Sequence, residues 1–166
     1  MIILGIDPGY AIVGYGIIRY EKNKFTVLDF GAITTPAKVD FSDRIMSIYA
    51  DLEYLFQKYK PDAMAIEKLF FNTNKKTAVD VAQARGVILL AARKNGAQCF
   101  EYTPLQVKQS VVGYGRAEKK QVQEMTRQLL GLSAVPKPDD TADALAMAIC
   151  HAHSSGSSFS LLKNIR

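Results

Sequence analysis

The sequence predicts an α/β fold in which helices cover both faces of a five-stranded mixed sheet. Three strand-like segments come first, before any helical pattern, and short turns join them, which indicates antiparallel pairing. Helical and strand-like segments then alternate along the chain, which favours right-handed crossovers between parallel strands. The expected strands are residues 2–7, 12–20, 25–33, 63–67 and 98–102.

Turn signals define the strands. Pro8-Gly9 ends the first apolar run, and Lys22-Asn23-Lys24 separates the second strand from the third. Pro61-Asp62 precedes the short fourth strand, and Gly96 precedes the fifth.

Apolar residues at helical spacing define the helices. Ser42 or Asp43 is expected near the first N-cap, and Gly96 is expected to cap the long second helix. Gly86 lies inside that long helix, where glycine costs about 1 kcal/mol relative to alanine, so we expect it to permit a close helix contact. The expected helices are residues 42–59, 75–95, 104–111, 118–130 and 139–153.

The chain of 166 residues, 48% of them hydrophobic, suits one globular domain over residues 1–153. The Ser/Gly-containing segment 154–166 is expected to be a flexible tail. The net charge of +5 is compatible with binding a polyanion such as nucleic acid, and equally with a generic basic surface. No apolar stretch approaches membrane-spanning length, and the two cysteines lack metal-ligand spacing, so a cytoplasmic protein is expected.

Four carboxylates occupy positions where acidic residues are costly. Asp7 and Glu67 end two apolar strands, at the sheet edge where ligands gather. Asp140 and Asp143 are three residues apart, so they share one face at the start of an apolar helix. Four converging carboxylates would repel one another unless a hard cation such as Mg²⁺ joined them, which indicates metal-assisted phosphodiester chemistry.

Each carboxylate also has a purely structural interpretation. Asp7-Pro8-Gly9 is a common turn sequence, and Glu67-Lys68 could form an exposed ion pair. Asp139 and Asp140 could cap the last helix, and we expect Asp139 to do so. Capping does not explain Asp143, which is followed by an apolar helical pattern.

Several motifs, in order and at family spacing from residue 1 to about 153, resemble the RuvC family of bacterial Holliday-junction resolvases, within the ribonuclease H-like superfamily. The motifs are Ile6-Asp7-Pro8-Gly9, Ala65-Ile66-Glu67 followed by Phe70, Gln83-Ala84-Arg85-Gly86, Tyr102-Thr103-Pro104, Val107-Lys108-Gln109, Gly115-Arg116-Ala117-Glu118-Lys119 and Asp140-Thr141-Ala142-Asp143-Ala144-Leu145-Ala146.

The resemblance implies a homodimeric, Mg²⁺-dependent endonuclease that nicks two opposing strands of a four-way DNA junction symmetrically. The four carboxylates would hold two Mg²⁺ ions, for which Mn²⁺ is expected to substitute, and the products would carry 5′-phosphates. The resemblance also implies cooperation with the RuvA–RuvB branch-migration complex and a preference for a short T-rich cleavage sequence.

Basic residues surround a glycine-containing loop at residues 111–115. Lys108, Arg116 and Lys119 are expected to contact DNA phosphates, and Lys108 and Lys119 match family lysines implicated in cleavage and DNA contact. Lys120 is interpreted as a solvated helix residue, while Lys75, Lys76 and Arg85 are weaker DNA candidates.

Two aromatic residues follow Glu67. Phe70 corresponds to a family residue that stacks on unpaired bases, and Phe71 is either a second wedge residue or core packing. Aromatic side chains are more often core than ligand-binding, so composition by itself would place both in the interior.

Three rival functions remain open. Another ribonuclease H-like nuclease could act on RNA or an RNA–DNA hybrid, which Lys108, Lys119 and the Phe70 wedge argue against. A sugar-kinase or actin-like ATP-binding protein begins with a similar strand and hairpin but needs a second lobe, for which this chain is too short. A catalytically inactive junction-binding module is disfavoured by the complete acidic set.

Overall fold

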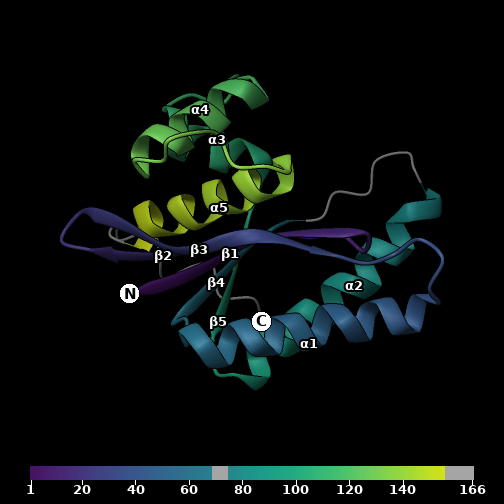
Figure 1. Ribbon diagram of the computed structural model, residues 1–166. Coiled ribbons are helices and arrows are strands. Elements are labelled where there is room, and N and C mark those ends of the chain that lie inside the picture. Colours follow the sequence, from purple (N-terminus) through teal and green to yellow (C-terminus); the bar gives the residue numbers. More distant parts are fainter. Residues whose placement is uncertain (69–74, 156–166) are drawn as a thin grey trace.

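The computed structural model describes residues 1–68 and 75–155 as one layered α/β unit (Figure 1). A five-stranded sheet lies between two helical layers, with α3, α4 and α5 on one face and α1 and α2 on the other. The strands are β1 (Ile2–Asp7), β2 (Ile12–Glu21), β3 (Lys24–Thr34), β4 (Ala63–Glu67) and β5 (Gln98–Tyr102). The helices are α1 (Phe41–Tyr59), α2 (Lys75–Lys94), α3 (Pro104–Val112), α4 (Lys119–Leu129) and α5 (Asp139–Ser155).

The strand order β3-β2-β1-β4-β5 confirms the mixed sheet expected from the sequence. β1 pairs antiparallel with β2, and β2 with β3, as their short turns require. β1 pairs parallel with β4, and β4 with β5, because helices connect these strands. None of the described helices has the length and apolar character needed to cross a membrane.

Alternation along the strands divides the core into two layers. On β1, Leu4 and Ile6 pack with the core on the α1–α2 side, whereas Ile3 packs with the core on the α5 side. On β4, Met64 and Ile66 belong to the α1–α2 side, and Ala63 and Ala65 to the α5 side. Asp7 lies four residues after Ile3, and Glu67 lies two residues after Ala65, so alternation places both on the sheet face that α5 covers.

Glycines let α5 approach the sheet closely. A Cβ added at Gly5 would lie 2.0 Å from the Ala144 carbonyl oxygen, and one added at Gly14 would lie 2.0 Å from the Asp140 carbonyl oxygen. Two strand positions therefore have to lack side chains for the helix to rest where it does.

Local details differ from the sequence-based expectations at several helix ends. α1 is capped at Asp40 without a side-chain hydrogen bond, rather than at Ser42 or Asp43. Asp139 is the first residue of α5, not its cap, and its carboxylate instead accepts a hydrogen bond of 2.7 Å from Lys137. α5 continues through Ser155, so two residues of the expected tail are helical, and residues 156–166 lie outside the described part.

Candidate active site

Asp7 and Glu67 lie at adjacent strand ends. β1 and β4 run parallel with Ile6 opposite Ile66, so the residues that follow, Asp7 and Glu67, reach the same carboxyl edge. Both are half-buried, and both belong to the sheet face covered by α5. Parallel pairing thus brings together two carboxylates that are sixty residues apart in the chain.

α5 delivers the second pair of carboxylates to this edge. Gly14 is the β2 partner of Asp7, and the same glycine lies against the backbone of Asp140. Asp140 therefore lies beside the strand pair that carries Asp7. Asp143 follows three residues later, on the same side of the helix, and is half-buried.

The carboxylates perturb one another electrostatically. Burial is the main cause that raises the pKa of Asp7 from 3.8 to about 7; the charges of Asp143, Glu67 and Asp140 contribute in that order, and the charge of Lys119 partly opposes them. Burial, and then the charge of Asp143, also raises the pKa of Glu67. The charges of Asp143, Glu67 and Asp140 thus act on Asp7 in one acidic site whose negative charge is only partly compensated.

Lys119 supplies part of that charge. Its Nζ lies 2.8 Å from Oδ2 of Asp143 and 4.0 Å from Oδ2 of Asp139. The hydrogen bond to Asp143 raises the pKa of Lys119, so the ammonium form is favoured. Lys119 is the first residue of α4, where a capping box between Glu118 and Gln121 fixes the backbone.

The donor set suits a hard divalent cation, because it consists of carboxylate oxygens whose charges Lys119 compensates only in part. Among residues 1–68 and 75–155, no group of three or more His, Cys, Asp or Glu side chains is yet spaced as a set of metal ligands. Side-chain movement toward the ion would therefore accompany binding. The chemistry of the residues fits the metal, and Lys119 shows where positive charge is already attracted.

The other predicted residues are less closely associated with the carboxylates. Lys108 is half-buried on α3, and Arg116 is exposed in the segment between α3 and α4. Phe70 and Phe71 lie outside the described residues. Arg85, a weak DNA candidate from sequence, forms an ion pair with Glu101 of β5 and its side chain is only 12% exposed, which favours a structural role.

One buried polar pair was not anticipated. His151 on α5 is 3% exposed, and its Nδ1 lies 2.7 Å from the hydroxyl of Tyr102 on β5. Burial lowers the pKa of His151 from 6.5 to about 4, so the imidazole is neutral at physiological pH. The sequence could not indicate that His151 would be buried and hydrogen-bonded, because its partner, Tyr102, comes from a strand far away in the chain.

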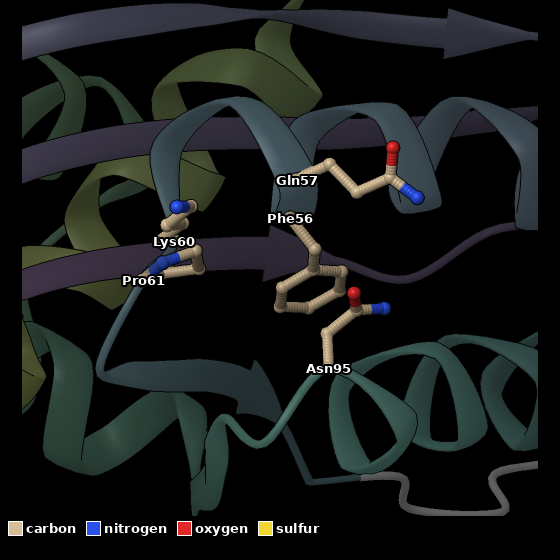
Figure 2. Close-up of a pocket in the computed structure, with 5 residues that line it drawn as sticks. All are labelled: Phe56, Gln57, Lys60, Pro61 and Asn95. Carbon is tan, nitrogen blue, oxygen red and sulfur yellow. The ribbon is translucent and has the colours of Figure 1, made fainter.

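A cavity of about 380 Å³ lies away from the acidic groups (Figure 2). It is lined by Phe56, Gln57, Lys60, Pro61 and Asn95. Figure 2 shows the Phe56 ring of α1 pointing toward Asn95, which follows α2. Pro61 precedes β4, so the cavity borders the amino end of that strand, whereas Glu67 lies at its carboxyl end. No carboxylate lines this cavity, and it is not the acidic site.

Comparisons with known proteins agree with this arrangement. Residues 3–151 match the family described as crossover junction endodeoxyribonuclease RuvC. The chain is 64% identical over 154 residues to the enzyme of that name from Ruminiclostridium cellulolyticum, covering 93% of both proteins. It is 60% identical to that of Clostridioides difficile, covering 93% of this chain and 91% of the relative.

Solved structures confirm the ribonuclease H-like fold expected from the resemblance. Thermus thermophilus RuvC superposes with a TM-score of 0.88 at 34% identity, covering 94% of this chain and 96% of the other. The same protein in complex with a Holliday-junction substrate gives a TM-score of 0.89 at 31% identity, with 99% of both chains covered. The sequence match over nearly the whole described fold, together with the clustered acidic residues, shows that the chain belongs to the RuvC family of crossover junction endodeoxyribonucleases.

Proposed function

We propose that this protein resolves four-way DNA junctions by symmetric paired nicks, acting in homologous recombination and DNA repair. Family membership supports the substrate, and the raised pKa values of Asp7 and Glu67, to which the charge of Asp143 contributes in both cases, are the observation that carries the chemistry. The reaction is hydrolysis of a phosphodiester that leaves a 5′-phosphate on one product.

The four carboxylates are the proposed ligands of divalent cations. Family resemblance supports two Mg²⁺ ions per site, with Mn²⁺ able to substitute. When bound, the ions supply Lewis-acid stabilisation of phosphate charge and lower the pKa of water. The protein holds the carboxylates on a rigid strand edge and on a packed helix, so their positions do not depend on loops.

Basic residues near the site bind and orient the DNA backbone. Lys119 and Arg116 are exposed, and Lys108 lies on α3, which packs against α5. Their charges neutralise phosphates, so junction affinity falls as the salt concentration rises. Lys108 and Lys119 additionally assist cleavage. Phe70 stacks on bases exposed at the junction centre, and Phe71 is a second candidate for that contact; both roles rest on the sequence.

A homodimer matches the two-fold symmetry of paired nicks. The proposed contact is an exposed face of α2 containing Val79, Gln83, Gly86 and Leu90. These residues are spaced by four, three and four positions, so they share one side of the helix. Val79 is 57% and Leu90 60% exposed, and a Cβ added at Gly86 would meet no described atom within 4 Å. Within the part of the chain that the structure describes, Gly86 thus faces open space, and we assign its expected close helix contact to a second copy.

Further features rest on the family resemblance. They are a cytoplasmic location, cooperation with the RuvA–RuvB branch-migration complex, and preference for a short T-rich sequence at the cleavage point. The domain proposed for these activities is residues 1–153, with the remaining segment serving as a tail.

Incubation with an end-labelled four-way junction, with and without Mg²⁺, tests the function. Paired nicks at symmetric positions are expected only with the ion. An RNA–DNA hybrid and a linear duplex serve as matched substrates, and preferential cleavage of the hybrid would favour the rival ribonuclease. Asp7→Asn should abolish nicking while the protein still binds the junction.

A further inference from the structure

We propose that Lys119 is a counter-ion of the acidic site in the metal-free protein, where its ammonium group pairs with the Asp143 carboxylate. When a divalent cation binds, this ion pair breaks and Lys119 becomes available to the DNA. The inference rests on the proposed function, because it takes Asp143 as a metal ligand. It assigns Lys119 a role in the metal-free protein that is separate from contact with a phosphate.

The contacts of Lys119 carry the first step. Its Nζ lies 2.8 Å from Oδ2 of Asp143, a full charge-assisted hydrogen bond. The Asp143 side chain is 29% exposed and that of Lys119 is 58% exposed. The lysine therefore reaches into the site from the solvent side, where it can leave without disturbing the core.

Competition between the two cations follows from their chemistry. The ammonium group uses the same Asp143 carboxylate that a Mg²⁺ ion would take at about 2.1 Å. A dication beside an ammonium group is repelled by it, and one carboxylate cannot neutralise both. The divalent ion gains from the remaining carboxylates as well, whereas among the described residues Lys119 has one carboxylate within 3 Å, that of Asp143. Metal loading therefore displaces the lysine.

The alternative partner of Lys119 is already engaged. Asp139 Oδ2 is 4.0 Å from Nζ of Lys119, and the other carboxylate oxygen of Asp139 accepts a 2.7 Å hydrogen bond from Lys137. The backbone at the start of α4 stays fixed by the hydrogen bond of 2.8 Å from the Glu118 amide to Gln121. The released side chain thus pivots on a fixed helix end, and a DNA phosphate is the free anion that it can reach when substrate is bound.

Three roles of Lys119 predict different changes in metal affinity. A counter-ion competes with the metal, so its removal makes the metal bind more tightly. A lysine that contacts only phosphate leaves metal affinity in the absence of DNA unchanged. A lysine that holds Asp143 in the orientation needed for the metal makes binding weaker when it is lost.

The experiment is a titration of the full-length protein with Mn²⁺ in the absence of DNA, in which electron paramagnetic resonance measures free Mn²⁺. The variants are Lys119→Met and Lys119→Gln, which remove the charge at an exposed position where methionine and glutamine are good helix formers. Lys120→Met is the matched control, since Lys120 is the next residue of α4, is also exposed and carries the same charge. Circular dichroism verifies that each variant is folded.

Loss of the competing ion pair should tighten Mn²⁺ binding by roughly 3- to 10-fold in both Lys119 variants, and Lys120→Met should change it less than about 2-fold. Junction cleavage should nevertheless fall in the Lys119 variants, because the released lysine no longer meets the phosphate. Unchanged or weaker Mn²⁺ binding in both Lys119 variants, or equal tightening in Lys120→Met, would overturn the counter-ion role alone. A wild-type protein that neither binds Mn²⁺ nor cuts a junction would overturn the proposed function and this inference together.

Discussion

The contact between Gly14 and α5 makes the geometry of the acidic site sensitive to a single methyl group. In Gly14→Ala, the new Cβ would lie 2.0 Å from the Asp140 carbonyl oxygen and 3.0 Å from the Asp140 Cβ. Real Cβ atoms essentially never approach another heavy atom within 3.0 Å, so the helix and strand must separate by about 1 Å at this point. The atom in the way belongs to the backbone, so no side-chain rotation relieves the clash.

This separation should affect stability and catalysis to different degrees. Overpacking of this kind costs about 1–3 kcal/mol of unfolding free energy. A displacement of about 1 Å at a reacting group costs on the order of 100-fold in rate. Because Gly14 also pairs with Asp7, the displacement changes the spacing between Asp7 and the α5 carboxylates directly.

Gly16→Ala is the matched control. It makes the same change on the same strand face, but its Cβ would meet Cγ and Cδ2 of Leu145 at 2.6 Å, whereas the nearest backbone atom, the Leu145 Cα, lies 3.1 Å away. The closest conflict is therefore with a side chain, away from Asp140 and Asp143. Urea unfolding and single-turnover cleavage of a junction should be measured for both variants. We expect comparable losses of stability but a much larger loss of cleavage for Gly14→Ala. Equal cleavage rates in the two folded variants would refute the idea that Gly14 sets the spacing of the site.

Three other predictions follow from the described contacts. Asp7→Asn should reduce cleavage by at least about 1000-fold while junction affinity measured by gel shift stays within a few-fold, since catalytic metal ligands contribute chiefly to the chemical step; lost binding in a folded variant would assign Asp7 a structural role. His151 has a folded-state pKa near 4, below its ordinary 6.5, so the unfolded state takes up the proton first as the pH falls. The contribution of His151 to the unfolding free energy is therefore lost between about pH 6.5 and 4, by up to about 3 kcal/mol. The raised pKa of Asp7 acts in the opposite direction over the same range, so the measurement is the difference between two proteins. In urea unfolding, the wild type should lose stability relative to His151→Gln as the pH falls through this range, and parallel profiles would contradict the assignment. Gly86→Glu should shift the protein from dimer to monomer in sedimentation experiments because it places charge on the proposed α2 contact, whereas an unchanged dimer would exclude that face.

Much of the fold was predictable because its signals are local. The turns at Pro8-Gly9 and Lys22-Asn23 and the alternation of later segments predicted every strand and the direction of each pairing. Gly96 adopts the left-handed conformation, with φ of 78°, that its position after α2 suggested. Helix starts were less predictable: α1 is capped at Asp40 and not at Ser42 or Asp43, and Asp139 is the first residue of α5, with its carboxylate accepting a hydrogen bond from Lys137.

The acidic residues were identified from the sequence because a carboxylate at the end of an apolar strand or helix is locally anomalous. Asp7 and Glu67 could also be placed at one edge, since parallel strands end together. By contrast, no local sequence pattern indicated the Arg85–Glu101 ion pair or the burial of His151 against Tyr102. Each joins a helix to a strand at least sixteen residues away, and residue type does not reveal such partners.

The sequence by itself determined where the strands lie, which residues end them and which side chains could bind cations, because periodicity and turn chemistry act over a few residues. Only the tertiary structure decided how closely α5 rests on Gly14 and that Lys119 reaches Asp143. Those distances result from the packing of segments far apart in the chain, where the absence of a Cβ at one position sets the place of a carboxylate at another.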